Sequence, residues 1–353
     1  MRLLVTGGAG FVGSNLALRL KRDRAGDQVI ALDSLKRRGS ELALERLRAG
    51  GVEFVHGDVR NPEDLEQVGR ADLLLECSAE PSALAGYEGG ARFLVHTNLL
   101  GTLNCLEFAR QHGAGVLFLS TSRVYPIAAL RSLPLERRGD RLAIPEERSG
   151  PGWSAAGIRA DFPLSGQRSL YGATKLCSEH LIEEYAAMYG LPAVVDRCGV
   201  IAGPWQMGKV DQGFVALWAA RHRFGGGLSY LGFGGEGTQV RDILHVDDLY
   251  DLVALQIADL EKHAGRVYAV GGGLSCSVSL RELSALCARL SGRTLSIGSR
   301  AETHPADIPY YVTDNSQVSA ETGWRPRRSR EELLQDVFTW LDQHAGQLRG
   351  ILT

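Results

Sequence analysis

Short continuous runs of hydrophobic residues alternate with amphipathic stretches through the first part of the chain. Continuous apolar runs are typical of strands covered on both faces, and amphipathic stretches are typical of helices. The expected strands are Arg2–Thr6, Gln28–Leu32, Val52–His56, Leu73–Glu76, Val116–Ser120 and Ala193–Asp196. The longer expected helices are Phe11–Leu20, Asn98–His112 and Leu170–Tyr189. This alternation predicts an α/β fold with a doubly wound parallel sheet, which binds ligands at the carboxyl ends of its strands.

The pattern changes after Asp196. Glycine-rich, irregular stretches at 197–213 and 228–238 flank a short helical pattern at 214–223. Further on, the capping boxes Ser279-x-x-Glu282 and Ser329-x-x-Glu332 predict the starts of two helices. We therefore expect a second, smaller domain in the C-terminal part of the chain.

A long segment without a periodic pattern, residues 126–167, precedes the expected helix at 170–189. It is rich in Pro, Gly, Arg and Ser. Loops of this length in a compact domain are usually functional or disordered. We expect this loop to form a wall of the active site.

A glycine-rich turn, Thr6-Gly-Gly-Ala-Gly-Phe-Val-Gly13, joins the first expected strand to the first expected helix. Glycine lets the backbone approach an anion, and the N–H groups and dipole at a helix N-terminus favour negative charge. Asp33 follows the second strand, about 20 residues downstream, where a carboxylate can bind a ribose diol. The spacing predicts a Rossmann-type dinucleotide site. A glycine turn without a ligand is the simpler alternative.

Composition narrows the function classes. The chain has 353 residues, 44% hydrophobic and 23% charged, which is typical of a globular protein, and its formal net charge is −2. We therefore expect no nucleic-acid or membrane partner. The six cysteines form no close pair and the nine histidines no H-x-x-x-H motif, so we expect no metal site. We recognise no signal peptide or spanning segment and expect a cytoplasmic protein.

Tyr171-Gly-Ala-Thr-Lys175 carries the candidate chemistry. Residues four apart on a helix share a face, and the lysine charge can lower the phenol pKa from about 10 towards neutrality. Such a tyrosine can remove a proton from a hydroxyl while hydride leaves the same carbon. Thr121 and Ser122 follow a strand, where a hydroxyl can bond the reacting oxygen. The simpler alternatives are a helix-surface pair and a strand cap.

Taken together, these motifs resemble the extended short-chain dehydrogenase/reductases that act on nucleotide-activated sugars. The resemblance covers nearly the whole chain. Besides the glycine turn and Tyr171-x-x-x-Lys175, it rests on His56-Gly-Asp58-Val-Arg60, Asn98-x-x-Gly-Thr102, Ser120 to Tyr125, and Gln239 to Asp247. The family has two features that differ here. His304 stands where arginine often binds the nucleotide phosphate, and Pro126 follows Tyr125 in place of glycine.

The resemblance implies a role for each matching residue. Tyr171 would be the base, Lys175 its partner and Thr121 a hydrogen-bond donor, with Ser122 beside them. NAD is the implied cofactor, with Asp33 at the adenosine ribose and Asp58 beside the adenine. The expected cofactor residues are Gly7, Gly10, Phe11, Val12, Gly13, Asp33, Ser34, Lys36, Asp58, Val59, Ser78, Ala79, Asn98, Ser120 and Lys175. The expected substrate residues are Arg123, Gln212, Gln239, Arg241 and Asp307, with Arg241 on the nucleotide diphosphate.

The residues after Thr121 favour one reaction within the family. The family's 4,6-dehydratases carry Asp-Glu there and its decarboxylases a glutamate, whereas this chain has Ser122-Arg123. The chain most resembles the CDP-paratose 2-epimerase group, at Ser120 to Tyr125, Asp211-Gln-Gly213 and Gln239 to His245. This implies inversion of C2 of a CDP-hexose through a 2-keto sugar.

Other functions stay open. A nucleotide-sugar 4-epimerase, ketoreductase or dehydratase would use the same scaffold. A non-catalytic NAD-binding module would have no use for Tyr171 and Lys175. We expect residues 1–203 to form the NAD-binding domain, with 239–250 folding back onto it, and 204–353 to form mainly the substrate-binding domain. The family also implies a homodimer formed through the helices at 98–112 and 170–189.

Overall fold

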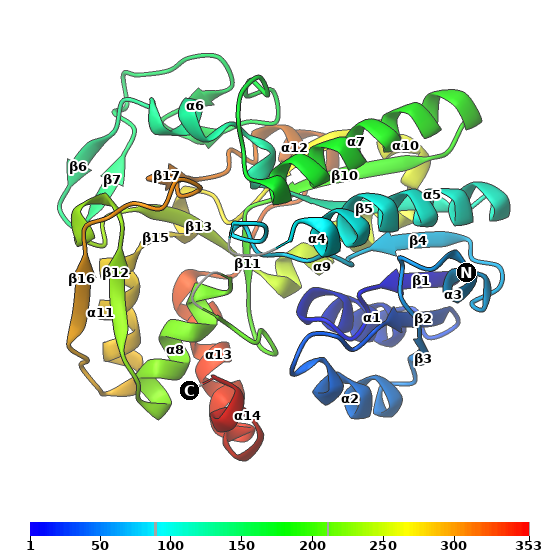
Figure 1. Cartoon of the computed structure of the whole chain (residues 1–353), viewed down its shortest axis with the longest axis horizontal. Coiled ribbons are helices and arrows are strands. Elements are labelled where there is room, and N and C mark those ends of the chain that lie inside the picture. Colours follow the sequence, from blue (N-terminus) through cyan, green and yellow to red (C-terminus); the bar gives the residue numbers. More distant parts are fainter. Residues whose placement is uncertain (88–89, 210–211, 353) are drawn as a thin grey trace. The chain divides into compact units, whose positions relative to one another are not determined.

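The computed structural model describes residues 1–87, 90–209 and 212–352 (Figure 1). Asp211, part of the motif Asp211-Gln-Gly213, lies outside the described residues. The chain forms two compact units. Unit 1 comprises Met1–Val124, Ser169–Arg197 and Tyr250–Tyr268, and unit 2 comprises Tyr125–Arg168, Cys198–Leu249 and Ala269–Thr353.

The sheet of unit 1 confirms the expected α/β fold with a parallel Rossmann-type sheet. Its seven strands lie in the order β14-β10-β5-β4-β1-β2-β3, and β1 pairs in parallel with both β2 and β4 (Figure 1). The strands are β1 (Arg2–Thr6), β2 (Gln28–Asp33), β3 (Glu53–His56), β4 (Leu73–Glu76), β5 (Gly115–Thr121), β10 (Ala193–Cys198) and β14 (Val267–Val270). The six strands expected from sequence are present, with bounds that differ by at most two residues at either end.

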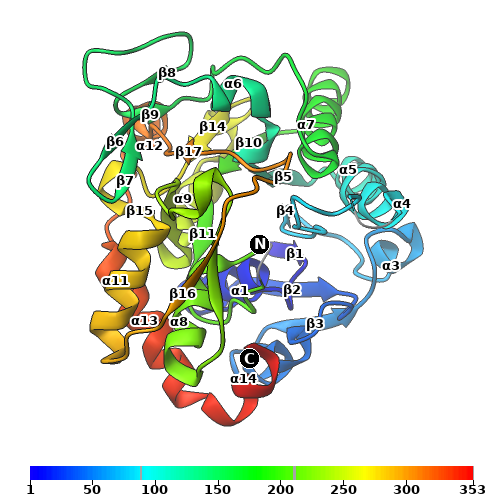
Figure 2. The same ribbon diagram turned by 60° about the vertical axis from the view of Figure 1, so that its left-hand side comes forward.

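Helices cover this sheet. Leu4, Leu74, Val116 and other sheet residues form one buried core with residues of α3 (Pro62–Glu66), α5 (Gly101–His112) and α7 (Leu170–Tyr189). Figure 2 shows the ribbons of these helices beside the sheet. Elsewhere in unit 1, Arg19 Nη2 of α1 (Phe11–Asp23) forms an ion pair of 3.8 Å with Asp251 Oδ1 of α9 (Val246–Ala258). The helices of unit 1 are α1 (Phe11–Asp23), α2 (Ala43–Ala49), α3 (Pro62–Glu66), α4 (Arg92–Val95), α5 (Gly101–His112), α7 (Leu170–Tyr189) and α10 (Leu260–His263). The helix α9 (Val246–Ala258) begins in unit 2 and ends in unit 1.

The helix expected at 98–112 begins earlier than predicted. α4 runs directly into a π-helical turn, His96–Leu100, and then into α5. Asn98 lies inside the wide turn and is fully buried, and its carbonyl accepts a hydrogen bond from Ser178. A tertiary contact of this kind, made to a residue of α7, has no local sequence signal.

Unit 2 contains the smaller C-terminal sheet. β13 pairs in parallel with β11 and β17 and antiparallel with β15, while β12 and β16 form a separate parallel pair. These strands are β11 (Val200–Ala202), β12 (Leu228–Leu231), β13 (Val240–His245), β15 (Ser277–Ser279), β16 (Ile297–Arg300) and β17 (Tyr310–Tyr311). The helices are α8 (Phe214–Phe224), α11 (Leu280–Ser291), α12 (Ser316–Thr322), α13 (Arg330–Gln343) and α14 (Ala345–Leu352). Both predicted capping boxes are present, at the starts of α11 and α13.

The segment 126–167 is not the irregular loop that its sequence predicts. It contains α6 (Ile127–Arg131) and two antiparallel ribbons. The ribbons pair β6 (Glu136–Arg138) with β7 (Arg141–Ala143) and β8 (Trp153–Ser154) with β9 (Gly157–Ile158). Ile158 donates a backbone hydrogen bond to Val312, so contacts with distant parts of unit 2 hold these short strands. Strands of two or three residues are too short to produce a periodic pattern.

The two units also divide the chain differently from the expected boundary at residue 203. Residues 125–168 and 198–203 belong to unit 2, and so does the segment 239–249 that was expected to fold back onto the first domain. The segment that returns to unit 1 is instead 250–268. The sheet pairing of β13 with β11 and β15 explains why 240–245 stays in unit 2.

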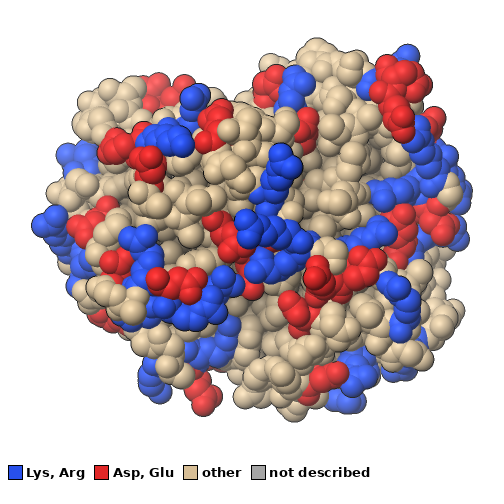
Figure 3. Space-filling model, turned by 180° about the vertical axis from the view of Figure 1, so that it is seen from behind, with Lys and Arg blue, Asp and Glu red and all other residues tan. Residues whose placement is uncertain are grey.

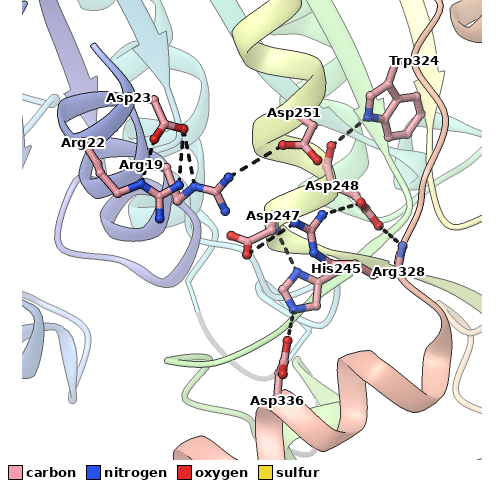
Figure 4. A network of polar contacts seen from close by, with 10 residues as sticks. All are labelled: Arg19, Arg22, Asp23, His245, Asp247, Asp248, Asp251, Trp324, Arg328 and Asp336. Carbon is pink, nitrogen blue, oxygen red and sulfur yellow. Dashed lines mark hydrogen bonds and ion pairs between the residues drawn. The ribbon is translucent and has the colours of Figure 1, made fainter. Parts of the chain in front are cut away.

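The start of α9 is held by a polar network (Figure 4). His245 Nδ1 accepts a hydrogen bond of 3.0 Å from the Asp247 amide, and so caps the helix. The Asp248 carboxylate accepts hydrogen bonds from the Arg328 amide, at 3.0 Å, and the Arg328 guanidinium, at 2.6 Å. The indole of Trp324 donates to the Asp248 carbonyl at 2.8 Å. The motif Gln239 to Asp247 therefore has a structural role at its carboxyl end, because it anchors α9 to the C-terminal segment of unit 2.

Charge is mixed on the surface. Figure 3 shows a face on which Lys and Arg side chains are interspersed with Asp and Glu, in agreement with the small formal net charge. No helix among residues 1–87, 90–209 and 212–352 has the length and apolar character needed to cross a bilayer. In the same residues, no group of three or more His, Cys, Asp or Glu side chains is arranged to hold a metal ion.

Candidate active site and cofactor site

The glycine turn between β1 and α1 leaves no room for side chains at Gly7, Gly8 and Gly13. Gly7 has φ +62°, and a Cβ there would lie 2.9 Å from the carbonyl carbon and oxygen of Cys77. At Gly13, a Cβ would lie 2.2 Å from the Gly7 oxygen. Gly13 thus packs the first turn of α1 onto the glycine turn itself. The turn is closed by a hydrogen bond of 2.9 Å from the Gly10 amide to the Gly7 carbonyl.

The N-terminus of α1 suits an anion. Gly10 is the N-cap residue, no side chain caps the helix, and its first turn contains no acidic residue. Phe11 and Val12 are half-buried in this turn. Amide groups at such an end attract negative charge, and the glycines let a phosphate approach the backbone. The residues therefore fit the diphosphate of a dinucleotide.

Asp33 lies beside the glycine turn, at the end of β2. Its carboxylate accepts hydrogen bonds from the Ala9 amide, at 3.1 Å, and the Leu35 amide, at 2.8 Å. Burial raises the pKa of Asp33, although these backbone hydrogen bonds oppose the shift. Ser34, next in the chain, is half-buried. The structure therefore brings the acid and the glycines together as the sequence predicts.

Asp58, two residues after β3, pairs with Arg60 of the same motif. Arg60 holds the carboxylate through hydrogen bonds of 2.5–3.0 Å. Burial acts to raise the pKa of Asp58, but the Arg60 contacts outweigh it and the pKa is lowered. The ring of Phe93 lies 4.6 Å from Lys36 Nζ and 4.9 Å from the Arg60 guanidinium carbon. Phe93 follows no motif, and only the fold brings it to these cations.

Several expected cofactor residues have side chains engaged inside the protein. Asn98 exchanges two hydrogen bonds with the Glu80 backbone, of 2.7 and 3.1 Å, and is fully buried. Ser120 donates its hydroxyl hydrogen bond to the Glu179 carboxylate, which pairs with Arg197. These geometries favour positioning roles for Asn98 and Ser120 over direct side-chain contact with a cofactor.

Three further expected cofactor residues occupy different surroundings. Val59 is buried, and its carbonyl accepts a hydrogen bond from Asn104 at 2.8 Å. Ser78 Oγ lies 3.1 Å from Thr6 Oγ1, and Ala79 next to it is half-buried. Because Cys77 and Ser78 lie against Gly7, this strand end is part of the same site as the glycine turn.

The catalytic candidates of unit 1 lie at the ends of β5 and α7. Thr121 is the last residue of β5, and its Oγ1 accepts a hydrogen bond of 3.2 Å from the Arg123 amide. Ser122 is buried, whereas Tyr171, in the first turn of α7, is half-buried. Ser169 caps α7 and fixes its start, so Tyr171 and Lys175 share a helix face one turn apart.

Lys175 is almost completely buried. Its ammonium donates a hydrogen bond of 3.0 Å to the Leu119 carbonyl and lies 4.2 Å from the centre of the Phe118 ring. Both partners belong to β5, so α7 holds the charge directly against the sheet. A buried ammonium with few rotamers available provides a fixed positive charge near the ligand edge of the sheet.

Glu76 is a buried acid near this lysine that the sequence analysis assigned to a strand only. It is 1% exposed, and Thr102 donates a hydrogen bond of 2.6 Å to its Oε1. Burial raises the pKa of Glu76 to about 7, while the Lys175 charge opposes the shift. One feature of the sequence could have indicated Glu76: it is an acidic residue at the last position of an otherwise apolar strand.

In unit 2, two of the expected substrate residues lie together. Arg241 Nη2 donates a hydrogen bond of 3.0 Å to Asp307 Oδ1 and one of 2.6 Å to the Ile308 carbonyl. Arg131, which no motif indicated, donates hydrogen bonds of 2.9 Å to the carbonyls of Asp307 and His304. The segment that carries Asp307 is thus held by two arginines.

The two expected glutamines of unit 2 differ in surroundings. Gln239 is buried, and its Nε2 donates a hydrogen bond of 2.9 Å to the Leu231 carbonyl. Gln212 exchanges backbone hydrogen bonds with Lys209, of 2.7 and 3.2 Å. His304 Nδ1 accepts a hydrogen bond of 3.1 Å from the Ala306 amide, so this side chain stabilises its own turn.

Comparison with known proteins gives full-length relatives of several activities. The chain is 29% identical to the CDP-paratose 2-epimerase of Salmonella typhi over 347 residues, which covers 96% of this chain and 99% of the relative. A solved structure of a double mutant of the dTDP-glucose 4,6-dehydratase DesIV of Streptomyces venezuelae, with NAD bound, has 30% identity and a TM-score of 0.80. This comparison covers 99% of this chain and all of the other. A Thermus thermophilus UDP-glucose 4-epimerase complex with NAD has 27% identity and a TM-score of 0.76, covering 97% and 99%.

The family itself is identified over most of the chain. The NAD dependent epimerase/dehydratase family matches residues 3–271, which include the glycine turn and the Tyr171–Lys175 pair. The match covers the glycine turn and the parallel sheet described above, and the chain therefore belongs to the NAD-dependent epimerase/dehydratase family, whose members are enzymes of the extended short-chain dehydrogenase/reductase type.

Proposed function

We propose that this chain is an NAD-dependent nucleotide-sugar epimerase that inverts C2 of a CDP-hexose. One observation carries the choice of reaction: the two residues after Thr121 are Ser122 and Arg123, so neither of them supplies a carboxyl group. Elimination of water needs an acid and a base at the sugar, whereas epimerisation needs one base that later returns its proton. The similarity to the Salmonella typhi CDP-paratose 2-epimerase supports the same choice.

Unit 1 has the residues to hold NAD. The glycine turn and the N-terminus of α1 would hold the diphosphate, Asp33 the adenosine ribose, and Asp58 would lie beside the adenine. Asp33 opposes the 2′-phosphate of NADP by charge repulsion. When bound, NAD supplies the hydride acceptor that later returns the hydride to the opposite face of the sugar.

The chain's own residues would move the proton. Tyr171 removes the proton from the C2 hydroxyl, and the Lys175 charge favours the tyrosinate form that can do so. Thr121 Oγ1 would donate a hydrogen bond to the sugar oxygen. On re-reduction, Tyr171 returns a proton to the same oxygen. The sugar thus changes configuration without net oxidation or consumption of cofactor.

The nucleotide must stay bound while the keto sugar turns. We assign nucleotide binding to Arg241, whose guanidinium would meet the diphosphate, with Asp307, Gln212 and Gln239 of the same unit around the substrate. Arg241 is only 13% exposed and is already oriented by Asp307, which reduces the entropic cost of binding an anion.

Proton NMR of CDP-glucose incubated with the purified enzyme, without added cofactor, tests the proposal. A manno-type product establishes inversion at C2 with resident NAD. A galacto-type product rejects C2 and identifies a 4-epimerase instead. A 4-keto-6-deoxy product identifies a dehydratase. If CDP-glucose is unchanged, the CDP-hexose assignment fails for this sugar, and UDP- and GDP-glucose are tested in the same way.

Tyr171→Phe is the matched control for this experiment. It removes the phenol oxygen and keeps the ring, so turnover is expected to be lost while NAD, released by denaturation and quantified, stays at the wild-type amount. Turnover equal to the wild type would reject Tyr171 as the base. If the variant loses bound NAD as well as turnover, Tyr171 does not act in proton transfer alone.

We also propose a homodimer formed through α5 and α7. Exposed apolar side chains of α7 and of the π-helical turn before α5 support it: Leu100, Leu170, Met188 and Tyr189 are 41–66% exposed. Light scattering during size-exclusion chromatography is expected to give twice the chain mass of 38.2 kDa. A monomer at micromolar concentration would reject the dimer.

A further inference from the structure

Glu76 is an ionisable residue buried in the core of unit 1. It is the last residue of β4, where it pairs with Thr6 of β1 and Phe118 of β5. Paired residues of a parallel ladder point to the same face of a sheet. Leu74, two residues earlier, belongs to the core under α5 and α7, so Glu76 faces the same helices. Carboxylates are rarely buried in this way unless they are paired.

The contacts of Glu76 leave one oxygen without a hydrogen bond. Thr102 of α5 donates to Oε1 over 2.6 Å. Oε2 is buried and has no hydrogen-bond partner in the part of the chain that the structure describes. A buried charge with half of its acceptor capacity unused requires a nearby positive charge, or it takes up a proton.

Lys175 provides that positive charge. Its ammonium lies 4.2 Å from the centre of the Phe118 ring, and Phe118 is the register partner of Glu76. The ammonium of α7 therefore lies over the residue that pairs with Glu76, on the sheet face to which Glu76 also points. The Lys175 charge also acts to lower the pKa of Glu76, against the burial that raises it to about 7.

We propose that Glu76 is a positioning residue for the Tyr171–Lys175 pair: its carboxylate, buried on the sheet face over which the Lys175 ammonium lies, weakens the pull of that ammonium on the Tyr171 proton. The proposal rests on the proposed role of Tyr171 as the base. An ionised Glu76 partly cancels the lysine field, so Tyr171 keeps its proton more strongly. A protonated Glu76 leaves the full lysine charge to favour tyrosinate.

The other titratable groups around Glu76 stay uncharged. Cys105 faces it from α5, and Cys77 follows it in the chain, and burial raises the pKa of both thiols well above the ordinary value. Thr6 of β1, Thr102 of α5 and Phe118 of β5 carry no charge. The Glu179 carboxylate, one turn after Lys175 on α7, is paired with the Arg197 guanidinium at 2.7 Å. We therefore assign the pH dependence to Glu76, Lys175 and Tyr171.

The variant Glu76→Gln removes the charge but keeps the size and the acceptor for Thr102. The readout is the ultraviolet phenolate absorbance of the protein as a function of pH, minus that of the matching Tyr171→Phe protein. We expect the Tyr171 midpoint to fall by about half a unit to one unit in Glu76→Gln. Asp196→Asn is the matched control, because Asp196 is an equally buried acid of the same sheet that is bonded to Gln256.

Each outcome of this titration decides the proposal. The proposal is supported if the Tyr171 midpoint falls in Glu76→Gln and does not fall in Asp196→Asn. In Glu76→Asp the midpoint should return towards the wild-type value. No shift, or an equal shift in Asp196→Asn, overturns it. If Glu76→Gln does not fold, Thr102→Val replaces it. That variant removes the hydrogen bond to the carboxylate, so Glu76 keeps its proton to higher pH. A smaller fall of the Tyr171 midpoint is then expected, and an unchanged midpoint again overturns the proposal.

The titration needs no substrate, so it separates this proposal from the proposed function. A shifted midpoint in a protein that converts no nucleotide sugar would reject the epimerase and retain the coupling. Normal epimerisation with an unshifted midpoint would reject the coupling and retain the epimerase. In an active enzyme, the acidic limb of the kcat profile is expected to move to lower pH in Glu76→Gln by the same amount as the titration midpoint.

Discussion

The Lys175 ammonium lies 4.2 Å from the centre of the Phe118 ring, on the face of β5 that α7 covers. This contact and the hydrogen bond of 3.0 Å to the Leu119 carbonyl hold a positive charge one helical turn from Tyr171. The fold therefore gives the candidate base a fixed electrostatic partner. A flexible surface lysine would provide a weaker and more screened field.

Lys175→Met is expected to lower the turnover rate by about 10²–10⁴-fold, because Tyr171 then loses the charge that favours its ionised form. The double variant with Tyr171→Phe should be little slower than either single variant, since the two residues act as one unit. Steady-state kinetics measures both effects. Lys262→Met, at an exposed lysine of α10, is the control and should leave the rate unchanged. Fully additive losses would contradict the pairing.

Gly13→Ala is expected to destabilise the protein by about 3 kcal/mol and to abolish NAD retention. The new Cβ would lie 2.2 Å from the Gly7 oxygen and 2.9 Å from Gly8 Cα, and backbone atoms cannot move aside without distorting the phosphate turn. Urea denaturation and the amount of NAD released on denaturation are the measurements. Gly26→Ala meets nothing within 4 Å and should match the wild type in both. Full NAD retention in Gly13→Ala would show that the turn does not hold the cofactor.

Arg241→Gln is expected to raise the KM for the nucleotide sugar by about 10–100-fold, with a smaller change in kcat. This factor corresponds to the free energy of one charge-assisted hydrogen bond. NAD retention should not change, because the expected cofactor residues belong to unit 1. Arg137→Gln, at an exposed ion pair of the same unit, is the control. An unchanged KM would reject Arg241 as the anchor of the diphosphate.

The buried carboxyl group of Asp196 makes the free energy of unfolding depend on pH. Burial raises its pKa from 3.8 to about 7, and the hydrogen bond from Gln256 offsets only part of this. The folded protein therefore binds a proton more tightly than the unfolded chain does. The stabilising contribution is complete below pH 3.8 and is lost as pH rises towards 7, by up to about 4 kcal/mol.

Asp196→Asn removes this dependence. Its free energy of unfolding should match that of the wild type near pH 4 and exceed it by several kcal/mol near pH 8, because asparagine has no charge to bury. Urea denaturation of both proteins at the two pH values measures the difference. A difference that does not change with pH would show that Asp196 is not protonated in the folded state at acidic pH.

Local sequence patterns predicted the parts of the site that depend on neighbouring residues. The glycine turn, the strand before it and the helix after it form one continuous segment, Arg2 to Asp23, and the structure contains all three. The capping boxes at Ser279 and Ser329 also depend on contacts three residues apart. The order of motifs along the chain was sufficient to indicate the family, since each motif is itself local.

Contacts between distant residues decided the rest. Glu76, Phe93 and Arg131 follow no motif, and they reach the candidate sites because β4, α4 and α6 are packed against elements far away in sequence. Asn98 and Ser120 match family motifs, yet packing commits their side chains to Glu80 and Glu179. Residues 250–268 return to unit 1 and lead into β14, which pairs with β10. Residues near each other in the chain therefore specify the strands of the parallel sheet, the glycine turn and the helix caps, because hydrophobic period and backbone preference act within a few residues. Which charges are buried, and what they contact, follows from the folded chain alone, because burial depends on residues brought together from far apart.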